Sequence, residues 1–294
     1  MSARHPIIAL TGSSGAGTTS TGRTLKTILE AAGVNTVMVE GDSFHRFTRD
    51  EMSAIAAQGR FGSANHFSLE ANHIDKLEAL FIQYGLQGQG RFRRYVHNED
   101  EDLIDAGYQP GTFTAWDPIV PGTDCLFYEG LHGGLSVPGF NIARHVDLLI
   151  GVAPIVNLEW IQKIYRDTHY RGYSEEAVVS TIINRMEDYV RFIVPQFANT
   201  HINIQRVPTV DTSNPFIVRE VPTHEECFVI IRFQDYRQID MLWLRNSIPG
   251  AFSSKRDTLV IPGDALPLAI NLIIKPWALE LIMNGRGLRQ KLAR

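Results

Sequence analysis

One stretch of the sequence decides the fold: Gly12-Ser13-Ser14-Gly15-Ala16-Gly17-Thr18-Thr19. It follows an apolar run at 7–10, which predicts a buried strand, and it opens a helical segment at 18–32 that ends at Gly33. The glycines of such a turn let the backbone wrap closely around phosphate groups, and the N–H groups at the start of the helix favour their negative charge. The eight residues are therefore candidates for binding the phosphates of a nucleotide.

The position of the usual P-loop lysine is occupied by Thr18. The next residue, Thr19, carries a hydroxyl at the helix start, where such a group can bind Mg²⁺. The alternative interpretation is a glycine-rich turn between a strand and a helix that binds no ligand.

The rest of the chain alternates between short apolar runs and segments with helical spacing. The predicted strands are 7–10, 36–39, 126–128, 146–152, 228–233 and 258–261. The predicted helices are 18–32, 70–84, 156–167, 266–283 and one that starts after Ser174 as its N-cap and stops near Pro195. This alternation predicts an α/β fold of the P-loop nucleoside triphosphate hydrolase type, with a mostly parallel sheet flanked by helices.

Two polar, irregular segments, 47–65 and 91–121, predict loops over the carboxyl edge of the sheet, where ligands bind in such folds. Residues 85–90 (GLQGQG) predict a flexible turn. No linker or repeat divides the chain, so we expect 1–294 to form a single domain with a lid or loop insertions over that edge.

The composition fits a soluble globular protein, with 294 residues, 44% of them hydrophobic and 20% charged. A net charge of −4 excludes a global field that attracts nucleic acid. Cys125 and Cys227 each lie in an apolar run and are expected to be buried thiols. The apolar run at the N-terminus is too short for a signal peptide, and no stretch approaches the ~20 apolar residues of a membrane span. We therefore expect a cytoplasmic protein with neither a membrane nor a nucleic acid as partner.

Two carboxylates follow predicted strands. Asp42 comes directly after the strand at 36–39, and there it could accept the proton of a substrate hydroxyl. Glu129 ends the apolar run CLFYE and could hold Mg²⁺ directly or through water. The plainer alternatives are a helix-capping Asp and a surface Glu.

Basic residues gather in three places. His45, Arg46 and Arg49 follow Asp42, and a second cluster spans 91–97, ending in His97. Lys163 and Arg166 are three residues apart and share a helix face, and Arg171 follows in a loop. A solvated charged surface is the simpler interpretation of each cluster, but all three together favour a site for a phosphorylated substrate.

At this point the sequence resembles the bacterial phosphoribulokinases. The strings that carry the resemblance run in order through the first 216 residues: HPIIALTGSSGAGTTS, VEGDSFHRFTR, YGLQGQGRFRRYVH, LFYEGLHGG, IVNLEWIQKIYRDTHYRGY and QRVPTVDTSNPF. Together they are specific, because other P-loop kinases lack most of them.

The resemblance implies phosphorylation of D-ribulose 5-phosphate by ATP to D-ribulose 1,5-bisphosphate, with Mg²⁺, in carbohydrate metabolism such as the Calvin cycle. It implies that Asp42 is the catalytic base and that Glu129 serves Mg-ATP. His45, Arg49, His97 and Arg171 would contact the sugar phosphate. Lys163 and Arg166, with Asp167 nearby, would lie on a mobile lid and meet the transferring phosphoryl group, so that the missing lysine is replaced. A homo-oligomer is implied as well.

Two other functions are kept as alternatives. One is a P-loop kinase for uridine or pantothenate, which the basic clusters disfavour because a neutral acceptor needs fewer cations. The other is a nucleotide-binding regulator without turnover, which only the missing lysine supports.

Overall fold

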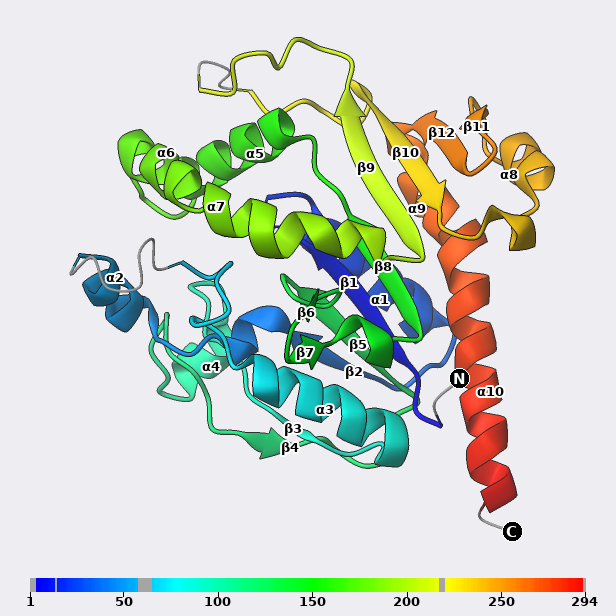
Figure 1. The fold of residues 1–294 in the computed structure, drawn as a ribbon, viewed down its shortest axis with the longest axis horizontal. Coiled ribbons are helices and arrows are strands. Elements are labelled where there is room, and N and C mark those ends of the chain that lie inside the picture. Colours follow the sequence, from blue (N-terminus) through cyan, green and yellow to red (C-terminus); the bar gives the residue numbers. More distant parts are fainter. Residues whose placement is uncertain (1–3, 14, 58–64, 217–219, 293–294) are drawn as a thin grey trace.

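The computed structural model describes residues 4–13, 15–57, 65–216 and 220–292. They build an eight-stranded sheet in the order β11-β12-β10-β9-β8-β1-β5-β2 (Figure 1). The strands of this sheet are β1 (Ile7–Gly12), β2 (Thr36–Glu40), β5 (Cys125–Gly130), β8 (Leu148–Val152), β9 (Ile202–Pro208), β10 (Cys227–Phe233), β11 (Phe252–Lys255) and β12 (Thr258–Pro262).

The sheet has a parallel part and an antiparallel edge. β2, β5, β1, β8 and β9 pair in parallel, whereas β10, β12 and β11 continue the sheet in antiparallel pairs. All residues of β1 and β8 are buried, as expected for parallel strands covered on both faces. In β10 buried and more exposed residues alternate, the pattern of a strand with one covered face. The predicted α/β fold with a mostly parallel sheet is confirmed.

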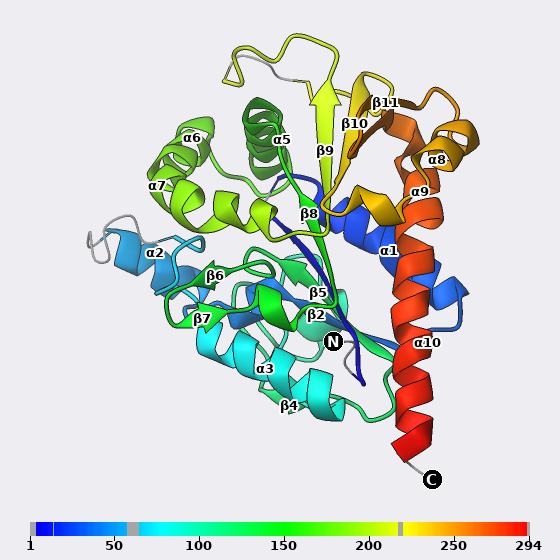
Figure 2. The ribbon, with the colours of Figure 1, turned by 45° about the vertical axis from the view of Figure 1, so that its right-hand side comes forward.

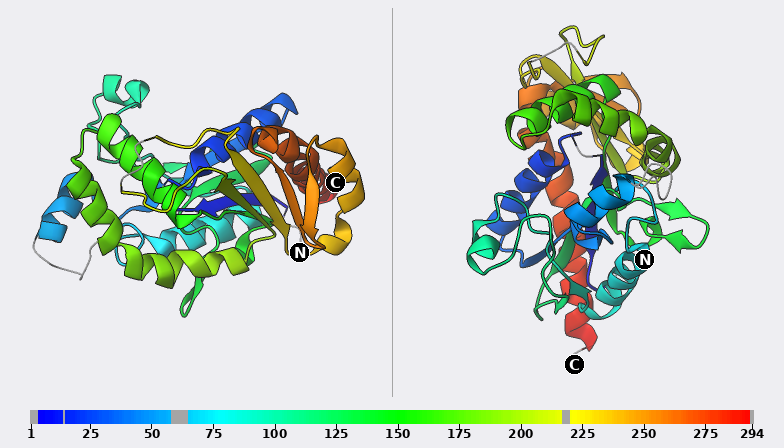
Figure 3. Two further views of the ribbon diagram at one scale, coloured as in Figure 1. Left: turned by 90° about the horizontal axis from the view of Figure 1, so that it is seen from above. Right: turned by 90° about the vertical axis from the view of Figure 1, so that its left-hand side faces the viewer.

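Helices cover both faces of the parallel part. Ile8 and Leu10 belong to one apolar cluster with α1 (Thr18–Ala31), and Ile7 and Ala9 belong to another with α3 (Ile74–Gln87). Seen from above, α1 and the C-terminal helix lie on one side of the sheet and α3 on the other (Figure 3). Because the residues of a strand alternate in direction, one short strand supplies both cores.

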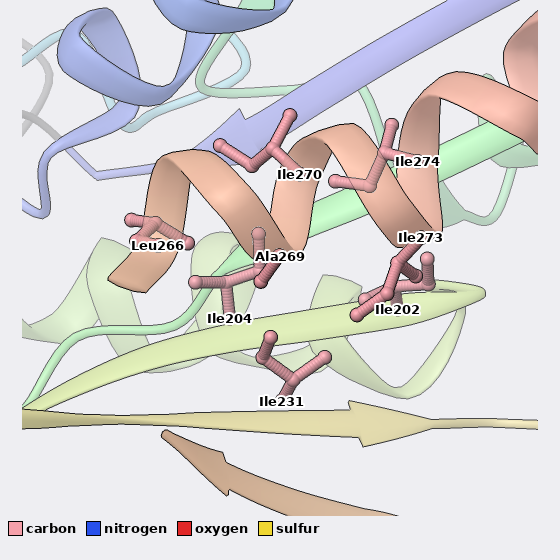
Figure 4. A pocket seen from close by; sticks show the side chains of 8 residues that line it. All are labelled: Ile202, Ile204, Ile231, Leu266, Ala269, Ile270, Ile273 and Ile274. Carbon is pink, nitrogen blue, oxygen red and sulfur yellow. The ribbon is translucent and has the colours of Figure 1, made fainter. Parts of the chain in front are cut away.

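The C-terminal helical segment, α9 (Leu266–Ala269), the π-helical turn η7 (Ile270–Ile274) and α10 (Lys275–Leu292), packs against the sheet. The eight side chains between it and strands β9 and β10 are all apolar and leave no room for a water molecule (Figure 4). By length and composition alone, Gly263–Leu292 could cross a membrane, which the sequence did not lead us to expect. Its contacts with α1 and with the first apolar cluster make it part of the packing around the sheet.

The helical stretch after Ser174 differs from its prediction at its end. Ser174 is the N-cap, since its Oγ accepts a hydrogen bond from the backbone N–H of Ala177. The expected stop near Pro195 is wrong. The chain stays helical through α6 (Glu175–Asn184), α7 (Met186–Asp188), η3 (Tyr189–Ile193) and η4 (Val194–Ala198), and the proline lies in the first turn of η4, where its missing N–H needs no helical partner.

Other helix boundaries differ from their predicted positions because of local contacts. The helix predicted at 70–84 begins only at Ile74, because Asn72 pairs with His45 in an isolated bridge and its side chain donates to the carbonyls of His66 and Ser68. It continues to Gln87, so the flexible turn predicted at 85–90 is restricted to its last residues, starting at the left-handed Gly88. Both cysteines are free and buried, as expected.

The two segments predicted as loops contain short regular elements. In 47–65 the structure has α2 (Arg49–Ala57), and residues 58–64 lie outside the described part. In 91–121 it has α4 (Glu101–Asp105) and the small ladder of β3 (Arg91–Phe92) with β4 (Asp117–Pro118). Elements that the sequence did not predict are β9, α8 (Met241–Ser247), β11 and the β6–β7 hairpin (Ser136–Val137, Phe140–Asn141).

Candidate active site

The phosphate loop lies where β1 ends and α1 begins. Ser13 is fully buried, and its carbonyl accepts a hydrogen bond from Ala16 N at 3.1 Å, which closes the turn. Gly15 has φ +107°, and a Cβ there would lie 3.1 Å from the carbonyl oxygen of Glu159 in α5 (Val156–His169). Only glycine satisfies both demands. Of the eight residues predicted to bind phosphates, Ser14 lies outside the described residues, and the other seven form this turn and the first residues of α1.

A carboxylate and a hydroxyl face each other beside the loop. Thr19 Oγ1 donates to Glu129 Oε1 at 2.9 Å, and burial raises the pKa of Glu129. Mg²⁺ in phosphate-transfer sites is bound by one or two carboxylates, substrate phosphates and several waters. One carboxylate with a hydroxyl beside the phosphate loop fits this kind of site.

The predicted base stands on a single 3₁₀ turn after β2. Asp42 lies in η1 (Gly41–Phe44), with its side chain 42% exposed and Oδ1 3.5 Å from His45 Nε2. His45 is buried and stacks on His66 with ring centroids 3.8 Å apart. Burial lowers the pKa of His45 to about 3, so this imidazole is neutral at pH 7.

The ends of β2 and β5 are in backbone contact. A Cβ on Gly41 would lie 2.8 Å from the Cα of Gly130 and 2.6 Å from the hydroxyl of Tyr128. A Cβ on Gly130 would meet the Cα of Gly41 at 2.6 Å. The turn that carries Asp42 is therefore fixed against the strand that carries Glu129.

Arg49 and His97 lie on the same side of the site as Asp42. Arg49 begins α2, and its Nη1 donates to Asn98 Oδ1 at 3.1 Å. His97 Nε2 is 3.8 Å from Glu40 Oε2, at the end of β2. The tyrosine ring of Tyr95 contacts both His45 and His97 edge-on. The structure thus brings His45 and Arg49, from the segment after β2, and His97, from a second segment, to one side of the sheet edge.

The predicted cations of α5 are held by one carboxylate. Lys163 Nζ pairs with Asp167 Oδ2, Arg166 Nη2 lies 2.8 Å from Asp167 Oδ1, and Arg171 Nη1 lies 3.4 Å from the same oxygen. Burial lowers the pKa of Lys163 to about 8. Burial alone would raise the pKa of Asp167, but Lys163 and Arg166 together lower it.

Helix α5 packs directly on the phosphate loop. The Cβ of Lys163 is 3.4 Å from the place that a Cβ on Gly15 would occupy. In the amide orientation that satisfies both of its atoms, Gln162 donates to the carbonyl of Gly15 and accepts from Arg206. In Figure 2, α6 and α7 lie on the same side of the molecule as α2. In the sheet, β1 lies between β8, which leads into α5, and β5, whose other neighbour β2 leads into the turn of Asp42. The two predicted groups, base and cations, therefore flank the loop.

The structure adds three residues to the predicted site. Glu159 contacts Tyr189, and burial raises its pKa to about 7. Arg185 lies among the charges of Asp167, Asp42 and Glu159, and burial lowers its pKa. His132 is buried, and neither of its ring nitrogens has a hydrogen-bond partner among the described residues. The string LFYEGLHGG contains His132, but no spacing rule marks it out.

The phosphate loop joins a strand to the N-terminus of a helix, and an acid follows each of the next two strands of the sheet, β5 and β2. This arrangement defines the class of the protein, which is a P-loop kinase. A model of the phosphoribulokinase / uridine kinase family matches residues 7–213, and the chain belongs to that family.

Similarity to individual proteins extends over nearly the whole chain. A plasmid-encoded phosphoribulokinase of Cupriavidus necator is 52% identical over 285 residues, covering 96% of this chain and 97% of that protein. A probable phosphoribulokinase of Escherichia coli K12 is 50% identical, covering 97% and 99%. The solved structure of the phosphoribulokinase from Rhodobacter spheroides superposes with a TM-score of 0.87 at 46% identity, covering 96% and 99%. The resemblance predicted from the sequence is confirmed, whereas the roles of single residues stay predictions.

Proposed function

We propose that this chain is a phosphoribulokinase, which transfers the γ-phosphoryl group of ATP to the 1-hydroxyl of D-ribulose 5-phosphate. The products are D-ribulose 1,5-bisphosphate and ADP. One observation carries the proposal: phosphoribulokinases are 46–52% identical to the chain over at least 95% of its length. The arrangement of a phosphate loop between a carboxylate turn and a group of cations supports it.

On the acceptor side, Asp42 takes the proton of the 1-hydroxyl as the oxygen attacks the γ-phosphorus. Its half-exposed carboxylate at the end of β2 is accessible to a substrate, which a general base requires. Arg49 and His97 bind the 5-phosphate, and the neutral ring of His45 donates or accepts one hydrogen bond without adding charge.

On the nucleotide side, the backbone of the loop at Gly12–Gly17 and the N-terminus of α1 bind the phosphates of ATP. Thr19 and Glu129 hold Mg²⁺, which supplies charge stabilisation to the phosphates when bound. The contact of α5 with Gly15 places Lys163 beside the phosphate loop.

The cations of α5 replace the absent P-loop lysine. Lys163 and Arg166 stabilise the charge that spreads over the equatorial oxygens of the transferring group. Arg171 contacts the sugar phosphate from the loop that contains Gly172, whose φ of +73° and exposed surroundings suit a hinge between α5 and α6. We propose that this region closes as a lid over the bound substrates.

A coupled assay of ADP release tests the function. The purified protein is given Mg-ATP with ribulose 5-phosphate, with uridine, or with no acceptor. We expect rapid ADP release with ribulose 5-phosphate only. Preferential turnover with uridine would show that the protein is a uridine kinase. ADP release that does not depend on an acceptor would show that it is an ATPase and not a sugar kinase.

We also propose that the protein is a cytoplasmic homo-oligomer. Support for both comes from the resemblance to bacterial phosphoribulokinases. Light scattering after size-exclusion chromatography tests the oligomer, and cell fractionation with an antibody against the chain tests the compartment.

A further inference from the structure

The turn that carries Asp42 is held from a distant part of the chain by Arg93. The guanidinium donates from Nε to the carbonyl of Ser43 at 2.9 Å and from Nη2 to the carbonyl of His45 at 2.6 Å. These two residues follow Asp42 by one and by three positions. We propose that Arg93 is a positioning residue, which sets the orientation of Asp42 and His45 without touching the substrate.

Arg93 is partly buried against two aromatic rings. Its guanidinium carbon lies 3.6 Å from the centre of the Phe113 ring and 4.8 Å from that of Trp116. Among the described residues it forms no ion pair, and burial lowers its pKa. Its charge is thus directed at two carbonyl oxygens and two aromatic faces, which are the partners of a structural cation.

The neighbouring arginine has the opposite environment. Arg94 Nη1 lies 2.7 Å from Asp102 Oδ2, Arg94 Nη2 lies 3.6 Å from Asp100 Oδ1, and the side chain is 44% exposed. The sequence placed both arginines in one basic cluster and suggested a phosphate site. The structure separates them, since one faces the turn and the other faces solvent and acids.

Arg93 accounts for half of the carbonyl hydrogen bonds along the turn. The carbonyl of Asp42 accepts from His45 N, and that of Phe44 accepts from His73 N at 2.7 Å. The remaining two carbonyls, of Ser43 and His45, accept from Arg93. Without this side chain both would lose a charge-assisted partner, and the turn could rotate. A displacement of about 1 Å at a reacting group costs roughly 10²-fold in rate.

The inference rests on the proposed function, because it takes Asp42 as the base. The test compares Arg93→Met, Arg93→Lys and Arg93→Ala with the matched control Arg94→Gln. Active protein is counted by titration with a fluorescent ATP analogue, and kcat and both KM values are measured with whichever acceptor the wild type turns over. We expect kcat per nucleotide site to fall about 10²-fold in Arg93→Met. Arg93→Lys should lose less, because an ammonium can serve one carbonyl at a time. The KM for ATP should stay within about twofold, and Arg94→Gln should match the wild type.

Chemical rescue separates positioning from mere folding. Millimolar methylguanidine should restore part of the turnover of Arg93→Ala and none of that of Asp42→Asn. A normal kcat per nucleotide site in Arg93→Met overturns the inference. If Arg93→Met fails to fold, Arg93→Lys decides. The inference is overturned if the turnover of Arg93→Lys falls only in proportion to its number of nucleotide sites, so that kcat per site is unchanged. If the wild type does not phosphorylate ribulose 5-phosphate, the proposed function is contradicted instead. The inference about Arg93 is still tested, because kcat of the variant and of the wild type is compared with the acceptor that the wild type does use.

Discussion

The two flanks of the phosphate loop are built by different means. On the side of the predicted base, the four carbonyls from Asp42 to His45 all accept hydrogen bonds, and His45 is a buried, neutral ring. On the cation side, Lys163, Arg166 and Arg171 are held by one shared carboxylate, Asp167. The first flank is held through hydrogen bonds to its backbone carbonyls, and the second through ion pairs between side chains.

This difference indicates a division of labour in the reaction. A general base must be within hydrogen-bond reach of its proton before the reaction starts, so a rigid turn suits it. Cations that act on the transferring group are of most use when their contacts strengthen in the transition state. In the proposed reaction, the transferring phosphoryl group offers Lys163 and Arg166 a second anion besides Asp167.

The largest effect is expected at the rigid flank. Asp42→Asn should lower kcat by about 10²–10⁴-fold, because the amide cannot accept the hydroxyl proton. The affinity for ATP, measured with a fluorescent analogue, should not change. Asp50→Asn, on the exposed face of α2, is the control and should behave as the wild type. Turnover near the wild-type rate in Asp42→Asn would exclude this residue as the base.

The next effect is expected at the adaptable flank. Arg166→Ala should reduce kcat by about 10²–10³-fold, the usual cost of removing one preorganised group that stabilises the transition state. The KM for ATP should change far less, since the contact strengthens only during transfer. Arg191→Ala, an exposed arginine beyond the break at Arg185, is the matched control. If kcat and the affinity for ATP change equally, Arg166 binds ATP already in the ground state. The proposed difference between the two flanks would then be lost.

A smaller effect is expected in substrate binding. Arg49→Ala should raise the KM for ribulose 5-phosphate roughly 10- to 100-fold, since a charge-assisted hydrogen bond is worth about 1.5–3 kcal/mol. His45→Asn should also raise this KM, but by less, because the neutral ring contributes no charge. Initial rates at varied sugar phosphate and saturating ATP give the values. A raised KM for ATP with an unchanged KM for the sugar would move these residues to the nucleotide side.

The smallest effect concerns pH. Burial lowers the pKa of Lys163 to about 8, so the ammonium is present below this pH and is lost above it. If the charge is needed, kcat/KM for ATP should fall about tenfold by pH 9, because roughly one enzyme in ten keeps the proton. Lys163→Arg should keep its activity at pH 9, as a guanidinium stays charged. If the activity of Lys163→Arg still falls above pH 8 as in the wild type, the fall is due to the titration of another group.

The sequence predicts what depends on neighbouring residues. The strand, loop and helix at 7–32 follow from an apolar run, glycines and a helical pattern, and Ser174 follows from its capping chemistry. α2 was within reach too: Thr48 and Glu51 form a capping box, with Glu51 N donating to Thr48 Oγ1 and Glu51 Oε2 accepting from Thr48 N.

Other features depend on contacts between distant segments. β9 escaped prediction because Gln205 and Arg206 interrupt its apolar pattern, and only the fold supplies their partners, the carbonyls of Pro154 and Pro222. Likewise, no local pattern distinguishes Arg93 from Arg94. The aromatic rings and carbonyls that contact Arg93 lie 20 to 50 positions away in the chain, whereas the acids paired with Arg94 lie six and eight positions away.

The contact between Gly41 and Gly130 has a consequence for redesigning the enzyme. Neither position has space for even a methyl group, so the distance between the turn of Asp42 and the strand of Glu129 is fixed. Attempts to adapt the catalyst to bulkier or longer sugars cannot succeed by loosening this junction. Selection for new acceptors should instead enrich changes around Arg49 and His97, whose contacts with Asn98 and Glu40 are made between side chains.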